Sequence, residues 1–225
     1  MDINFLSKTP LFRGILPEEI EAMEKCLHLK EKKYKKQELI YHAGDVIRSA
    51  GLVLSGSVSI EHDDIWGNKS ILDKVGPGKI FAESYACAPS TPLMVNVVAA
   101  TDCSVLFLEI SHILKFCNHA CSYHSKLIRN LLAISAQKNL NLSRKIFHTS
   151  SKSIRNRLLS YLSFQATQHG SYTFDIPFNR QQLADYLSVD RSALSNEIGK
   201  MQKDGLILAK RNSFSILDMK VMDHV

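Results

Sequence analysis

The apolar residues between positions 179 and 205 recur at the spacing of two short helices with a tight turn between them. They are Leu183, Ala184 and Leu187 in the first helix and Leu194, Ile198 and Met201 in the second. The segment Ser188–Asp190 interrupts the pattern. Asp190 is a good N-cap because its carboxylate can accept hydrogen bonds from the first free amides of the following helix. The pattern therefore predicts a helix-turn-helix.

The second of these helices carries a polar face opposite its apolar one. That face holds short donors and acceptors together with cations, namely Arg191, Ser192, Ser195, Asn196, Gly199, Lys200 and Lys203, with Glu197 at its edge. Such a surface can approach base edges and phosphates closely. Two short strands follow around a basic tip at Lys210–Ser213, as in a hairpin. This order is typical of a winged helix-turn-helix, which favours DNA binding over the alternative of an ordinary amphipathic helix pair with a solvated face.

From about Leu29 to Ile110 the chain changes to short β-rich runs separated by glycine turns. The runs include 39–41, 52–54, 58–60, 70–72, 95–99 and 105–108, and the turns lie at Gly44, Gly56, Gly67 and Gly76–Gly78. Many short strands with evenly spaced turns suggest a sandwich or barrel. Residues 5–30 predict short helices, one of which has Pro17 in its first turn.

A long helix is predicted from Ser111 to about Arg144, and its apolar residues form two adjacent stripes. The first stripe is Ile113, Phe116, Ala120, Tyr123, Leu127, Leu131 and Ile134, and the second is Leu114, Cys117, Cys121, Ile128 and Leu132. Two stripes imply two surfaces to cover, and we expect these to be the β domain and a second copy of the same helix. A polar joint at His148–Lys152, which is a candidate hinge, leads to another amphipathic helix from Ser153 to about Gln168 and to a strand at 173–177.

The charge of the chain is unevenly distributed. Residues 144–225 hold 12 Lys and Arg against 7 Asp and Glu, whereas residues 1–143 hold 16 against 15. Nearly all of the formal net charge of +6 therefore lies with the helix-turn-helix, where a polyanion would bind. The sequence has no apolar run of membrane-span length, and its start does not resemble a signal peptide. We expect a cytoplasmic protein with no membrane partner.

The order of these parts resembles the CRP/FNR family of transcription regulators over nearly the whole chain. The segments that carry the resemblance are His42–Asp45 (HAGD), Leu54–Val58 (LSGSV), Gly67, Pro77–Ser84 (PGKIFAES) and Asn179–Ile198 (NRQQLADYLSVDRSALSNEI). The resemblance implies an α+β fold in three parts. These are an N-terminal sensor β-roll of the double-stranded β-helix or jelly-roll type in residues 1–110, a dimerisation helix in 111–145, and a winged helix-turn-helix DNA-binding domain in 146–225.

The resemblance also implies a homodimer that reads a palindromic operator in double-stranded DNA. Its paired recognition helices would enter successive major grooves, roughly 34 Å apart. The expected DNA contacts are Arg180 and Gln181 to phosphates, Arg191, Ser192 and Asn196 to bases, and Ser195, Lys200, Lys210 and Arg211 on the same surface. Ser192 stands where many members have a glutamate, and Asn196 where many have a second arginine, so the usual half-site is not expected. RNA polymerase would be a further partner if the protein is an activator.

The sensor pocket departs from the members that bind cyclic nucleotides. Those members place an arginine, which neutralises the phosphate, ten residues after a glutamate. Here Glu83 is present, but the arginine position is Leu93, followed by Met94 and Val95. A buried phosphate without a cation is unfavourable, so we expect no response to cyclic AMP or GMP and either an unknown small-molecule effector or none. Glu83 then either contacts an effector or accepts hydrogen bonds from its own loop.

The cysteines offer little evidence for a metal or redox site. There are five, at positions 26, 87, 103, 117 and 121, without a CxxC pair, which argues against a disulfide scaffold and a standard zinc module. Cys117, Cys121 and His124 share one helix face and could bind a metal. The same positions continue an apolar stripe, where cysteine packs as a small side chain. We predict packing, with no metal and no cofactor.

Three other functions compete with that of a non-enzymatic regulator. A cupin-like β-barrel enzyme fused to a DNA-binding module would need an HxH histidine pair, but the β segment has only His42 and His62, far apart. A second alternative is a cyclic AMP-responsive regulator with an atypical pocket. The third is an interaction protein that uses the long helix, which would leave the basic C-terminal part unexplained.

Overall fold

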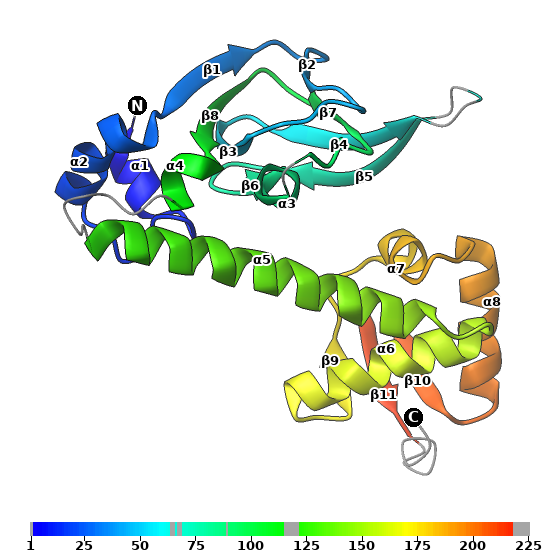
Figure 1. Ribbon diagram of the computed structural model, residues 1–225. Helices are drawn as coiled ribbons and strands as arrows, with labels where there is room; N and C mark the ends of the chain where they lie inside the picture. The colour runs from blue at the N-terminus through cyan, green and yellow to red at the C-terminus, as the bar shows by residue number, and fades with distance from the viewer. Residues whose placement is uncertain (1, 64–65, 67–68, 89, 115–121, 218–225) are drawn as a thin grey trace. The chain divides into compact units, whose positions relative to one another are not determined.

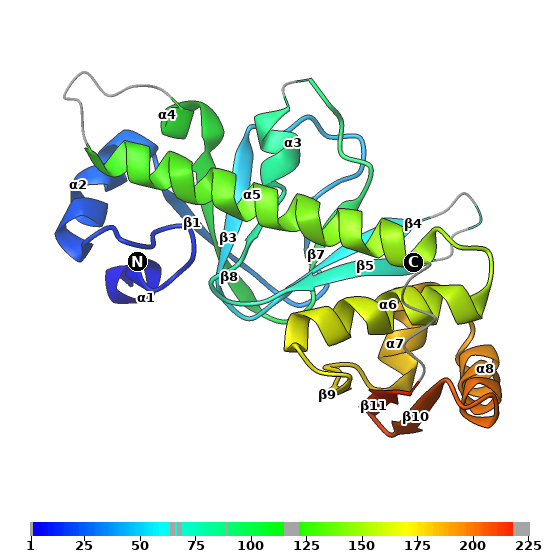
Figure 2. The same ribbon diagram turned by 90° about the horizontal axis from the view of Figure 1, so that it is seen from below.

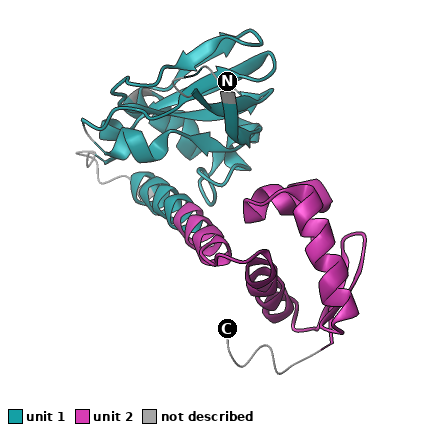
Figure 3. Cartoon of the chain, turned by 90° about the vertical axis from the view of Figure 1, so that its right-hand side faces the viewer, with its two compact units in different colours: residues 1–137 teal, residues 138–225 magenta. Residues whose placement is uncertain are grey.

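The computed structural model describes residues 2–63, 66, 69–88, 90–114 and 122–217 (Figure 1). The chain divides into two compact units, residues 1–137 (unit 1) and residues 138–225 (unit 2), shown in Figure 3. Unit 1 is rich in strands and unit 2 in helices, so the predicted α+β fold is confirmed. Among the described residues, none of the helices has the length and hydropathy of a membrane span.

Unit 1 contains two four-stranded antiparallel sheets. The first has the order β1-β8-β3-β6, with β1 at Lys30–Tyr34, β8 at Cys103–Glu109, β3 at Ser49–Ser55 and β6 at Ile80–Phe81. The second has the order β2-β7-β4-β5, with β2 at Leu39–Tyr41, β7 at Asn96–Ala99, β4 at Val58–Asp63 and β5 at Lys69–Val75. Residues from both sheets, including Val53, Val58, Val97 and Val105, form one buried cluster.

A second core of unit 1 lies among its helices. Helices α1 (Ile3–Ser7), α2 (Pro17–Leu27) and α4 (Ile110–Leu114) gather near the first turns of α5 (Ser122–Thr149), as Figures 1 and 2 show. The ammonium of Lys126 lies 3.2 Å from the Glu19 carboxylate, and the Asn130 amide donates to the carbonyls of Leu11 and Arg13 at 2.9 and 2.8 Å. These contacts hold the start of α5 against the N-terminal helices.

The long helix differs in extent from the prediction. The structure describes α4 at the start of the predicted helix and α5 from Ser122, and residues 115–121, which include Cys117 and Cys121 of the proposed packing cluster, lie outside the described residues. Helix α5 also continues to Thr149, five residues beyond the predicted end. Leu127 and Leu131 of the first apolar stripe are buried, whereas Leu132 of the second is 68% exposed.

Unit 2 has one core formed by three helices and a small sheet. Its elements are α6 (Ile154–His169), β9 (Thr173–Asp175), α7 (Arg180–Leu187), α8 (Arg191–Lys203), β10 (Ile207–Lys210) and β11 (Ser213–Ile216), with the strand order β10-β11-β9. Figure 2 shows the three strands together. All six apolar positions predicted for the helix-turn-helix are buried in this core, so that prediction is confirmed.

The predicted polar joint is shorter than expected, because His148 belongs to the core of unit 2. Its side chain is 1% exposed, and its Nδ1 lies 2.9 Å from the hydroxyl of Tyr186 on α7. The rings of Tyr161 and Phe164 on α6 lie 5.6 and 5.4 Å from its ring. Burial, with a further contribution from Arg144, lowers the pKa of His148. The connection between α5 and α6 is therefore reduced to residues 150–153, where the Ser153 side chain caps α6.

Candidate nucleic-acid interface

The turn between α7 and α8 sets where the second helix starts. Ser188 ends α7 in the left-handed region at φ 54°, and the amide of Val189 donates to the carbonyl of Ala184 at 3.0 Å. The carboxylate of Asp190 accepts hydrogen bonds from the Ser192 hydroxyl and from the Ala193 amide, the latter at 2.9 Å. These bonds, the Ser192 bond first, lower the pKa of Asp190. The predicted N-cap is present, and α8 begins at Arg191.

The polar face of α8 points to solvent. Leu194, Ile198 and Met201 are buried on one side, and the predicted DNA-contacting residues lie exposed on the other: Arg191, Ser192, Ser195, Asn196 and Lys200, together with Lys203. We call this surface the α8 strip. Ser192 has a second role that the sequence did not reveal, since its hydroxyl donates to Asp190. Toward an outside group, this hydroxyl is left as an acceptor.

The one acid at the edge of the α8 strip, Glu197, is paired within the protein. Arg155 on α6 places its Nε 2.6 Å from the Glu197 carboxylate and an Nη 2.7 Å from the carboxylate of Asp204, which caps the end of α8. A negative charge beside a polyanion is unfavourable. The pair therefore removes an electrostatic conflict and ties α8 to α6.

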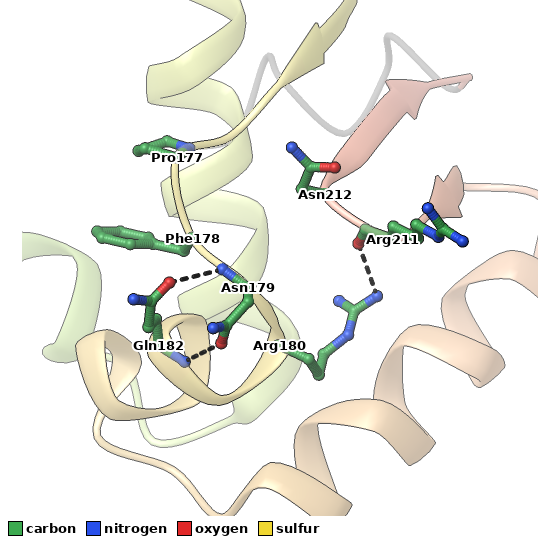
Figure 4. Close-up of a pocket in the computed structure, with 7 residues that line it drawn as sticks. All are labelled: Pro177, Phe178, Asn179, Arg180, Gln182, Arg211 and Asn212. Carbon is green, nitrogen blue, oxygen red and sulfur yellow. Dashed lines mark hydrogen bonds between the residues drawn. The ribbon is translucent and has the colours of Figure 1, made fainter.

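A pocket of about 530 Å³ lies between the start of α7 and the tip of the β10–β11 hairpin, or wing (Figure 4). It is lined by Pro177, Phe178, Asn179, Arg180, Gln182, Arg211 and Asn212. Asn179 and Gln182 form a capping box, in which each side chain accepts from the other's amide at 2.9 Å. Polar groups and a helix N-terminus thus face this pocket, a combination that suits an anion such as a phosphate.

Arg180 links α7 to the wing. Its guanidinium donates to the carbonyl of Arg211 at 3.3 Å and lies 5.6 Å from the ring centre of Phe214, and burial lowers its pKa. Figure 4 shows it reaching across the pocket, whereas the Arg211 side chain extends away from it. The nearby Gln181 amide donates to Asp185 at 2.8 Å. Arg180 therefore positions the wing as well as lining the pocket, a role that no local sequence pattern predicts.

The four candidate effector residues in unit 1 differ in burial. Glu83 opens α3 (Glu83–Cys87) and is 2% exposed, and Leu93 is also buried, whereas Met94 is 73% exposed and Val95 is half-buried. The backbone of Leu93 is fastened to the HAGD loop, since its carbonyl accepts from Gly44 at 2.7 Å and its amide donates to Asp45 at 2.9 Å. Among the described residues, no group of three or more His, Cys, Asp or Glu side chains is arranged to hold a metal ion.

Two family models match separate parts of the chain. The cyclic nucleotide-binding domain family matches residues 31–120, and the Crp-like helix-turn-helix domain family matches residues 156–225. The chain belongs to the CRP/FNR family. Members of this family bind DNA and regulate transcription. The helix-turn-helix of this CRP/FNR protein is therefore its DNA-binding part.

Known relatives align with this CRP/FNR protein over most of its length. The cyclic AMP receptor protein of Thermus thermophilus is 21% identical over 217 residues, which are 96% of each chain. The cAMP-activated global transcriptional regulator CRP of Haemophilus influenzae is 24% identical over 181 residues, which are 79% of each. The solved structures that share the fold include two that align over most of this chain. They are the Thermus thermophilus catabolite activator protein, with a TM-score of 0.52 and 22% identity over 96% of this chain and 97% of that one, and a cysteine-to-serine variant of CprK in complex with OCPA, with a TM-score of 0.62 and 12% identity over 91% and 93%.

Replacing Arg155 with Gln is expected to weaken DNA binding, because Glu197 would lose its closest cation and keep only the ammonium of Lys200, at 4.0 Å, beside the α8 strip. We expect a loss of about 1 kcal/mol, roughly fivefold in Kd, measured by fluorescence anisotropy with a labelled duplex at fixed salt. The double variant Arg155→Gln/Glu197→Gln should regain most of the affinity. If the double variant binds as weakly as the single one, Arg155 acts on DNA directly and not through Glu197.

Proposed function

We propose that this protein is a homodimeric, non-enzymatic regulator that binds a palindromic site in double-stranded DNA through α8 and the wing of each copy. The observation that carries the proposal is the α8 strip, on which cations and short polar side chains are exposed while the neighbouring acid is paired internally. Arg191 suits a bidentate contact with guanine. Ser192, whose donor is already in use, would accept from a base amino group. The wing cations Lys210 and Arg211, with Lys200 and Lys203, would contact phosphates.

The support for a dimer comes from the surface of α5. Large apolar side chains that are exposed in the single chain follow this helix, namely Leu132, Leu140, Leu142, Ile146 and Phe147. Leu132, Leu140 and Phe147 lie on one stripe, with the small residues Ala136 and Ser143 between them, at steps of three and four residues. Such a stripe is the seam of a two-stranded helical coil, and its exposure to water would be unfavourable. A second copy of α5 would cover it.

For the sensor part we propose that cyclic nucleotides are not the effector. The family match and the relatives named above make cyclic AMP the obvious alternative. The observation against it is Leu93, a buried apolar side chain at the position where a phosphate would need a cation. A different small molecule, or none, would then control the protein. RNA polymerase would be an additional partner if the protein activates transcription.

The dimer is tested by Leu140→Asp, which places a charge in the centre of the proposed seam. Light scattering should give a mass near twice 25.3 kDa for the unchanged protein and near 25.3 kDa for the variant, because burying an unpaired carboxylate is costly. The matched control is Lys145→Glu, which changes the charge of an exposed residue on the other side of α5 and should leave the mass doubled. A single-chain mass for the unchanged protein would contradict the proposal.

The role of Arg191 is tested with a duplex that the protein selects from a random-sequence pool. Arg191→Ala should weaken binding to this duplex by about 1–3 kcal/mol and binding to a random duplex much less, since a base contact is lost. Lys203→Ala serves as the control and should weaken both by similar factors. If Arg191→Ala lowers both affinities equally, Arg191 contacts a phosphate. If the unchanged protein selects no sequence, the proposed function is wrong.

The sensor proposal is tested by isothermal titration of the purified protein with cyclic AMP and cyclic GMP. We expect no binding of either nucleotide at concentrations up to about 1 mM, because Leu93 offers no charge to the phosphate. The Haemophilus influenzae relative, titrated under the same conditions with cyclic AMP, is the positive control. Binding in the micromolar range would contradict the proposal and favour the cyclic AMP-responsive alternative.

A further inference from the structure

Gly199, on the same side of α8 as the α8 strip, is a glycine that neither backbone conformation nor packing requires. Among the nine glycines for which the surroundings are described, six adopt a positive φ, and Gly51 has no room for a Cβ because it touches the ring of Phe81. Only Gly76 and Gly199 remain, with neither a backbone nor a packing requirement. Gly76 lies in a turn, where glycine is common. Gly199 lies in the third turn of α8 and is the only glycine inside a described helix.

Glycine in the middle of a helix is unfavourable. It gains conformational freedom on unfolding and contributes no side chain to packing, so alanine is preferred at such a position. Apart from its chain neighbours and the backbone of its own helix, a Cβ added to Gly199 would meet no described atom within 4 Å. The chain itself would therefore tolerate alanine at this position and be stabilised by it. The described part of the chain therefore gives no reason for glycine at this position.

The position of Gly199 on α8 indicates which bound molecule would approach it. It is three residues after Asn196, four after Ser195 and four before Lys203, so it belongs to the α8 strip and not to the buried side. The side chains beside it are short, and Arg191, Lys200 and Lys203 provide cations around them. A duplex whose base edges approach the short residues and whose phosphates meet the cations fits this arrangement.

We propose that Gly199 is a specificity-determining residue, at which a base pair of the bound operator approaches α8 so closely that a Cβ would collide with it. This inference rests on the proposed function. A methyl group at residue 199 would either push the helix away from the groove or displace the base contacts of Asn196 and Ser195. Glycine at this position thus favours the bound complex at the expense of the stability of the free protein.

The proposal predicts that Gly199→Ala stabilises the free protein and weakens its binding to DNA. Gly199→Ala should raise the thermal unfolding midpoint by about 2–8 °C. The Kd for the duplex selected by the unchanged protein should rise about tenfold. The Kd for a random duplex should change much less. Gly199→Leu should bind the selected duplex more weakly still, because the collision grows with side-chain size. The control is Thr167→Ala, at an exposed position of α6, which should leave both affinities unchanged.

The measurements are differential scanning fluorimetry and fluorescence anisotropy with the full chain. An unchanged or improved affinity of Gly199→Ala for the selected duplex would overturn the proposal while the proposed function stands. An equal loss on both duplexes would place the approach at the sugar–phosphate backbone and would also overturn the role in specificity. Failure of the unchanged protein to prefer any duplex would instead remove the proposed function itself.

Discussion

The burial of Leu194, Ile198 and Met201 decides which side of α8 faces solvent, and the whole interface depends on that choice. Each of these side chains is in the core of unit 2, where full burial of such a side chain contributes about 1.5–3 kcal/mol. The ion pairs of Arg155, at the surface, contribute on the order of 0–1 kcal/mol each. Apolar burial therefore orients the helix. The ion pairs of Arg155 alter the charge on the solvent-facing side of α8, but they do not decide which side faces solvent.

The packing of the helix-turn-helix extends to the end of α5. His148, in the last turn of α5, packs among rings of α6 and bonds to Tyr186 of α7. The final turns of α5 are thus joined to the helix-turn-helix by a buried hydrogen bond and aromatic contacts, not only through the short connection at residues 150–153.

The parts of the fold that follow one regular period could be predicted from the sequence. The apolar spacing of α7 and α8 and the cap at Asp190 were located to the residue, because 3.6-residue periodicity is a local property. Strand β1 was missed because Lys30–Tyr34 is almost entirely charged and only Tyr34 is buried. The pairing of Arg155 with Glu197, the link from Arg180 to the wing and the burial of His148 join residues that are distant along the chain, so no local pattern could reveal them.

The sequence departs from the family pattern on α8, at Ser192 and Asn196, and in unit 1, at Leu93. Substitutions at these two places differ in their expected cost to stability. Ser192 and Asn196, which we propose contact bases, are exposed on α8, and only Ser192 also bonds to the N-cap Asp190, so a change at Asn196 should have little effect on stability. Leu93 is buried, 3% exposed, with its backbone bonded to the HAGD loop. An arginine at this position would bring a charge into a buried place, which is costly unless the charge is paired. A change at Leu93 therefore acts on the packing of unit 1, whereas a change at Asn196 alters only an exposed surface of α8.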